Sequence, residues 1–236
     1  MSNQIVFLIE NKDILLEFPD GERLHFNLNS FPDEFLKWQS SARMRMFDIL
    51  KKKDSSKVVS QPAHLPVLAT LGEGSFSINL ATRGLGILPK KDKLIYFTNL
   101  FKETLEFCKE KEWDETLFKR VNTAILLYQE YNNFDTHILG GLEIFEGQTS
   151  KNLSKNPLAS LLFTGGPPQF LSFQFNGVIK FVDDKDPYYK FLRLARELFA
   201  FDRFHVPQTH YPYGYIFYLV NFKDKRPFPR GKSGHV

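Results

Sequence analysis

The chain has 236 residues, of which 42% are hydrophobic and 25% are charged, values that exclude a disordered polypeptide and allow a substantial core. The net charge of +4 is spread over mixed charges, and no aromatic and basic array recurs, so a nucleic-acid partner is disfavoured. One cysteine, Cys108, excludes an internal disulfide. Charged residues interrupt the opening apolar run before it reaches the length of a signal peptide or membrane span, so we expect a cytoplasmic protein without membrane contact.

Residues 1–60 predict a small β-meander followed by a helix. Three short apolar runs are separated by polar turns, at residues 5–9, 14–18 and 23–28. From Pro32 to Lys52 the apolar residues recur at near-helical spacing, and lysines fill the last turn. After an irregular polar connector at residues 54–62, a second unit is expected over residues 61–236.

The next segment, residues 65–113, predicts a β-hairpin, a third strand and a short helix. Two apolar strands, residues 64–71 and 76–88, flank the turn Gly72-Glu73-Gly74. A third strand is expected at residues 94–97, and the pattern then changes to helical spacing.

The remainder of the chain predicts more strands and two helices. Strands are expected at residues 123–128, 137–145, 159–164, 170–182 and 213–222. A short helix is expected from about Thr149 to Asn156, and an amphipathic helix over residues 183–199, with Pro187 in its first turn. The 25 Phe and 9 Tyr favour a strand-rich fold.

Three strings resemble a known family. VLATLGEGSFSINLATRGLGIL followed by KLIYFTNLFKETLEF is similar to the first three strands and first helix of the pyridoxamine phosphate oxidase-like, FMN-binding split-barrel family. LEIFEGQTSKNLSKNPLASLLF resembles the phosphate-side helix of that family. The resemblance covers roughly residues 64–222 and implies a mainly β, α+β fold: a six-stranded antiparallel split β-barrel with flanking helices, preceded here by the N-terminal β-meander.

Two stretches compete for the phosphate-side turn that this resemblance implies. In the first assignment Thr98, Lys102 and Thr104 hold the phosphate, and residues 114–158 are an insertion. In the second assignment the stretch from Thr149 to Asn152 has that role, but the strands before it then look too short to span a barrel side. A worn internal duplication with both turns is a third possibility. The first assignment is favoured because it follows the predicted hairpin.

The residue types in both stretches suit a phosphate, which helix-start N–H groups, hydroxyls and a cation neutralise together. The first stretch offers Thr98, Lys102 and Thr104, and the second offers Thr149, Ser150 and Lys151. The strand that ends in Thr82 and Arg83 offers a backbone edge to a flavin ring, with the Arg83 cation near its N1 and O2 atoms.

Each of these residues also has an ordinary structural interpretation. Thr98 and Thr149 are good helix caps, and Lys102 suits a solvated helix face. Arg83 suits a surface ion pair.

The histidines suggest a different site. His205 and His210, with His137 or His64, could bind a metal or haem, although Pro207 breaks the helical spacing and a loop role is favoured. The sequence contains no zinc motif, phosphate-binding Gly-Lys-Ser/Thr loop, nucleophile elbow or Rossmann fingerprint.

The leading functional hypothesis is an FMN-dependent oxidoreductase that acts on a small molecule. The alternative is a non-catalytic module that binds flavin or haem, because no catalytic acid or base can be assigned. The family resemblance also implies a homodimer with the flavin at its interface.

Overall fold

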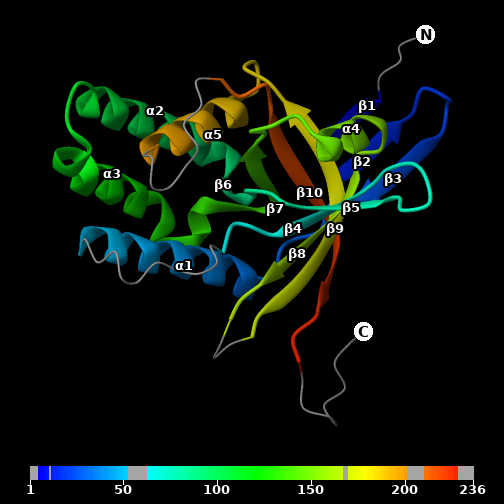
Figure 1. The fold of residues 1–236 in the computed structure, drawn as a ribbon, viewed down its shortest axis with the longest axis horizontal. Coiled ribbons are helices and arrows are strands. Elements are labelled where there is room, and N and C mark those ends of the chain that lie inside the picture. Colours follow the sequence, from blue (N-terminus) through cyan, green and yellow to red (C-terminus); the bar gives the residue numbers. More distant parts are fainter. Residues whose placement is uncertain (1–4, 11, 53–62, 167–169, 201–209, 228–236) are drawn as a thin grey trace.

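The structure is a computed structural model that describes residues 5–10, 12–52, 63–166, 170–200 and 210–227 (Figure 1). The predicted connector, up to Pro62, and the end of the basic tail lie outside the described residues. The N-terminal meander is confirmed as a three-stranded antiparallel sheet formed by β1 (Val6–Glu10), β2 (Asp13–Glu17) and β3 (Arg23–Asn27). Its inner residues Ile14 and Leu16 pack against Val178 on the outer face of the main sheet.

The main sheet of the described part has seven antiparallel strands in the order β5-β4-β8-β9-β10-β7-β6. In chain order they are β4 (Val67–Leu71), β5 (Ile78–Thr82), β6 (Gly86–Pro89), β7 (Phe134–Leu142), β8 (Leu158–Thr164), β9 (Ser172–Val182) and β10 (Gly214–Asp224).

The two edge strands of this sheet, β5 and β6, are consecutive in the chain. Only residues 83–85 join them, and these can span at most about 14 Å from Thr82 to Gly86. In a flat sheet, seven strands would place the edges about 29 Å apart. The sheet must therefore curl until its edges meet, so the chain that leaves β5 at one edge enters β6 at the other and closes a barrel.

Four helices form a layer beside the barrel: α1 (Asp33–Lys51), α2 (Lys91–Cys108), α3 (Trp113–Tyr128) and α5 (Pro187–Leu198). Within it α2 contacts both α3 and α5, and α1 contacts α3. The short helix α4 (Gln148–Lys155) lies apart from this layer and packs against β4 and β5 (Figure 1). A 3-10 turn at Tyr131–Asn133 leads into β7.

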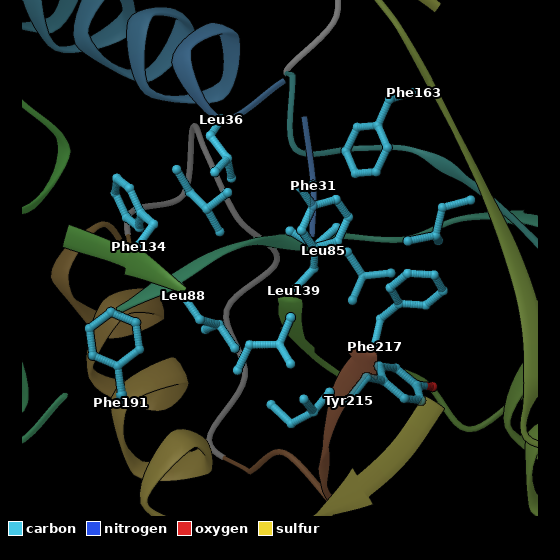
Figure 2. Close-up of a cluster of buried hydrophobic side chains, with 14 of the residues drawn as sticks. Phe31, Leu36, Leu85, Leu88, Phe134, Leu139, Phe163, Phe191, Tyr215 and Phe217 are labelled. Atoms are coloured by element: carbon cyan, nitrogen blue, oxygen red, sulfur yellow. The ribbon is translucent and has the colours of Figure 1, made fainter. Parts of the chain in front are cut away.

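The core lies between the helical layer and the concave side of the sheet. Phe134, Leu139 and Phe217 are fully buried there, and Phe191 from α5 reaches the same cluster (Figure 2). Phe35 from α1 makes edge-to-face contacts with Phe163 and Phe175. Many of the phenylalanines therefore pack in this core, while others, such as Phe76 at 99% exposure, lie on the surface.

Much of the predicted organisation is confirmed. The α+β class, the meander, α1, the hairpin of β4 and β5, and the two later helices are all present. Asp186 caps α5 by accepting a hydrogen bond from the Tyr188 N–H at 2.8 Å, and Pro187 occupies the first turn. The boundary between two units near residue 60 stays a prediction.

Three predictions about strands are wrong. Residues 94–97 lie in α2 and residues 123–128 lie in α3, so neither is a strand. The third strand of the opening segment is instead β6, the second half of the stretch predicted as one strand at 76–88. The sheet consequently has seven strands where six were expected.

The physical reason lies in the long-range packing of both helices. Ile95, Tyr96 and Phe97 favour strands locally, but Leu94, Phe97 and Phe101 share the buried face of a helix. In α3 the buried Val121, Ala124 and Leu127 follow the same spacing. A helical face that packs on the core overrides the local β preference. Among the described helices, none combines the length and apolarity that crossing a membrane requires.

Candidate functional site

The residues of the first phosphate assignment do not form a turn. Thr98 and Thr104 are buried inside α2, which begins at Lys91, seven residues before Thr98. The Thr98 hydroxyl donates to the Leu94 carbonyl at 2.7 Å, and the Thr104 hydroxyl lies 2.8 Å from that of Thr123 on α3. Lys102 is exposed on the same helix. These positions leave no helix N-terminus at Thr98–Thr104, so the turn predicted there is wrong.

The second assignment lies at a true helix start. Gly147 occupies the N-cap of α4 and has no side chain to accept from the first-turn N–H groups. The Ser150 hydroxyl accepts from the Gly147 N–H at 3.1 Å, while Thr149 and Ser150 are both buried. Lys151 is exposed on the outer side of the helix. The strand before this helix, β7, has nine residues, which removes the objection that it is too short.

Polar side chains of the hairpin meet this helix start. The Asn79 amide donates to the hydroxyls of Thr149 at 3.1 Å and Thr70 at 3.3 Å. Thr70 also accepts from the Asn152 amide at 3.1 Å. A Cβ on Gly72 would lie 2.9 Å from Asn152 Oδ1, so glycine permits this close approach. The four polar side chains lock α4 onto β4 and β5.

Arg83 lies where the barrel closes, directly after β5. One of its terminal nitrogens donates to the Thr149 hydroxyl at 3.3 Å and the other to the Thr82 carbonyl at 3.1 Å. Its Nε is buried and has no hydrogen-bond partner among the described residues. Thr82, opposite Val67 in the ladder, is exposed on the other face of β5. Of the two residues predicted on this strand, only Arg83 joins the cluster at α4.

Two further residues of the cluster are absent from the predicted phosphate and flavin contacts. Glu143, which follows β7, is 1% exposed, and Tyr213 precedes β10 and accepts the Glu143 N–H at 3.0 Å through its carbonyl. The Glu143 Oε1 atom accepts from the N–H groups of Ile144 and Phe145, both at 3.0 Å, whereas Oε2 has no partner among the described residues. The sequence signal was the lone carboxylate in the apolar run LGGLEIF.

Burial governs the ionisation of both groups. It raises the pKa of the Glu143 carboxyl, and the nearby Arg83 cation opposes that rise only in part. Burial also raises the pKa of the Tyr213 phenol, against a hydrogen bond with the Ser150 side chain. The side chains of one polar cluster therefore interact electrostatically: Arg83, Glu143 and Tyr213.

Replacing Glu143 by Gln tests this burial. Because the folded-state pKa is raised, ionisation is disfavoured in the folded chain, so wild-type stability falls as the pH rises from the ordinary glutamate range through the raised pKa. We expect the Gln variant to lack this loss, so it is the more stable protein at neutral pH and the gap closes near pH 4. Urea unfolding of both proteins at several pH values measures this difference in stability. A wild type that gains on the variant as the pH rises would contradict a buried acid.

The cluster has the features of an anion site. A helix start without a side-chain cap, the Thr149 hydroxyl and a guanidinium whose Nε has no partner among the described residues converge from α4 and the end of β5. Each group donates hydrogen bonds, and a phosphate offers only acceptors at neutral pH. The residues present thus fit a phosphate.

The predicted histidine constellation does not form among the described residues. His205 lies outside them, and His137 is engaged with Asp135 at 3.4 Å and with Ser30 at 3.3 Å. His210 is exposed. No group of three His, Cys, Asp or Glu side chains in the described ranges is arranged to hold a metal ion.

No family model and no curated protein matches the sequence. One similar solved structure is HupZ of Group A Streptococcus, which is 13% identical with a TM-score of 0.39; the match covers 78% of this chain and 93% of HupZ. Another is an F420 reductase, which is 11% identical with a TM-score of 0.37; the match covers 68% of this chain and 90% of the reductase. An FMN-binding protein from Syntrophomonas wolfei is 10% identical, with a TM-score of 0.41 over 80% and 97%.

The order of the strands decides the fold, because the two edges of the main sheet are joined by residues 83–85 alone. The chain has the split-barrel fold. In this split barrel, Arg83 lies at the closure point and α4 packs beside it.

Proposed function

We propose that this protein binds flavin mononucleotide and acts as a flavin-dependent oxidoreductase on a small molecule. The observation that carries the proposal is the convergence of Arg83, with its unpartnered Nε, on the N-terminus of α4. The flavin assignment rests on the strings at residues 67–88 and 142–163, which resemble the FMN-binding family.

In this proposal the phosphate lies at the start of α4. The first-turn N–H groups and the Thr149 hydroxyl donate to its oxygens, Ser150 shapes the start of the helix through its bonds with Gly147, and Arg83 supplies the cation. This differs from the sequence-based expectation that Arg83 faces the flavin ring, because its contact with Thr149 ties it to the phosphate side. A bound flavin would supply the electron or hydride transfer, while the chain binds and orients it.

Binding of FMN is the direct test. Titration of FMN against the purified protein is expected to quench flavin fluorescence with a stoichiometry of one per chain, and riboflavin is expected to bind at least about tenfold more weakly because it lacks the phosphate. Equal affinity for FMN and riboflavin would contradict a phosphate site at α4. Absence of binding by either would remove the flavin proposal.

The visible spectrum of the purified protein separates the flavin proposal from its alternative. A flavin spectrum that changes on addition of a reductant supports the oxidoreductase, whereas a haem spectrum with an intense Soret band would favour the haem-binding module. The cytoplasmic location stays a prediction from the sequence.

We also propose that the protein forms a homodimer through the outer face of β4 and β5. On this face Ile78 lies opposite Leu71 and Leu80 opposite Ala69, and Ile78 and Leu80 are 65% and 66% exposed. Val67 and Leu162 extend the same apolar surface.

A charged substitution on this apolar face tests the proposed dimer. Leu80→Asp is expected to shift the protein from dimer to monomer in analytical ultracentrifugation, because the carboxylate would be buried against apolar side chains of the second copy. Ile95→Asp is the matched control, since Ile95 is equally exposed, at 71%, on α2. A wild-type monomer at micromolar concentration, or a Leu80→Asp dimer, would contradict the proposal.

A further inference from the structure

The Glu143 carboxyl is the one acidic group of the polar cluster that is fully buried, at 1% exposure. Its Oε1 atom is held by the N–H groups of Ile144 and Phe145, so the orientation of the carboxyl is fixed. Its Oε2 atom is buried without a hydrogen-bond partner among the described residues, and the same is true of Arg83 Nε. Two buried polar atoms of the same cluster, Glu143 Oε2 and Arg83 Nε, therefore lack a hydrogen-bond partner among the described residues.

The chemistry of a phosphate determines what these two groups must be when it binds. Arg83 Nε is a donor and finds an acceptor in a phosphate oxygen. An ionised Glu143 would present a second acceptor, and the two negative groups would repel each other in a site with little water. A neutral carboxyl would instead donate from Oε2. A phosphate therefore satisfies both orphan groups only if Glu143 carries a proton.

Resting on the proposed function, we propose that Glu143 binds the FMN phosphate as a neutral carboxylic acid, so that the site takes up a proton together with its ligand. The proton comes from solvent and resides on Oε2, which donates to a phosphate oxygen. Glu143 thereby favours a ligand group that accepts hydrogen bonds, as a phosphate does, since a group that only donates would leave the protonated Oε2 unpaired.

The surrounding charges have opposing effects on this proton. Arg83, at the end of β5, favours the ionised carboxylate, as do the N–H groups of Ile144 and Phe145. Glu146, in the loop before α4, favours the protonated form, and the Tyr213 phenol faces the group from the start of β10. Burial is the largest influence, and it raises the pKa of Glu143. A bound phosphate adds negative charge and raises it further.

Isothermal titration calorimetry of FMN in buffers of different ionisation enthalpy tests the proposal, because it counts the protons taken up on binding. At about pH 8 the FMN phosphate is already doubly ionised in solution, its second pKa being about 6. We expect the wild type to take up as much as about one proton per FMN, and Glu143→Gln to take up none. The amide of the variant donates without a titrating proton, so its affinity stays within about threefold of wild type at neutral pH.

Glu103→Gln is the matched control, because Glu103 is an exposed carboxylate on α2 and does not belong to the polar cluster. It is expected to keep the wild-type proton uptake. The pH dependence gives a second measurement: the wild-type affinity falls as the pH rises above 8, by up to about tenfold per unit, while that of Glu143→Gln stays level.

Two results would overturn the proposal in distinguishable ways. Equal proton uptake by the wild type and Glu143→Gln, with FMN bound in both, would show that Glu143 does not carry the proton and would leave FMN binding intact. Failure of the folded wild type to bind FMN at any pH from 5 to 8 would overturn both proposals together.

Discussion

Replacing Arg83 by Gln is expected to weaken FMN binding by about 10- to 100-fold while the protein stays folded. Arg83 is half-buried, and a hydrogen bond between charged groups contributes about 1.5–3 kcal/mol. Gln keeps a donor and a similar length, but it loses the charge and the fork of nitrogens, one of which contacts Thr149. Fluorescence titration with FMN measures the change, and a circular dichroism melt checks the fold.

Lys102→Gln is the matched control for this prediction. Lys102 is a cation of the first sequence-based assignment, but it is exposed on α2, away from α4. We expect it to leave the FMN affinity unchanged. If Lys102→Gln weakened binding and Arg83→Gln did not, the phosphate would lie at α2 and the assignment to α4 would be wrong.

Riboflavin adds a second check on Arg83. Because riboflavin has no phosphate, its weaker binding is expected to be the same in the wild type and in Arg83→Gln. A loss of riboflavin affinity in the variant would instead place Arg83 against the flavin ring, as the sequence first suggested.

The elements that the sequence predicts well are those with a local signal. The hairpin of β4 and β5 follows from a glycine turn between two apolar runs, and α5 follows from Asp186 and Pro187 at its start. The short helix α4 follows from its polar first turn and the Asn156-Pro157 pair at its end. Each of these signals operates within a few residues.

The wrong predictions concern segments whose secondary structure or strand pairing depends on long-range contacts. Residues 94–97 are apolar and aromatic enough for a strand, and only packing of α2 against α3 and α5 makes them helical. Similarly, residues 78–89 form one extended stretch that changes partner between Leu85 and Gly86, from β4 and the residues before it to β7. Sequence periodicity cannot predict a change of partner, because the alternation continues across it.

The candidate site was predictable in its residue types but not in its grouping. Thr149 and Ser150 were identified as phosphate ligands, and Arg83 as a flavin contact, from separate motifs. The contact between Arg83 and Thr149 joins residues 66 positions apart, across the closure of the barrel. Glu143 was not predicted because a carboxylate after an apolar strand usually faces solvent, whereas this one is buried.

Replacing Gly141 by Ala is expected to destabilise the protein by about 3 kcal/mol or more, and to lower its melting temperature by roughly 6–12 °C. A Cβ at position 141, on β7, would overlap the carbonyl oxygen of Gly84, which follows Arg83 at the closure point. The obstacle is backbone, so no side chain can rotate away. Either the closing strand shifts and displaces Arg83, or the barrel opens, and FMN binding falls with stability.

Gly86→Ala is the matched control for the closure. Gly86 lies on β6, three residues beyond Arg83, and a Cβ there meets nothing within 4 Å. We expect its stability to change by less than about 0.5 kcal/mol, and chemical denaturation of both variants measures the contrast. A Gly141→Ala protein as stable as Gly86→Ala would contradict the close approach of β7 to the Gly84 carbonyl. The positioning of Arg83 over α4 depends on that approach, so the same pair of variants tests whether barrel closure builds the phosphate site.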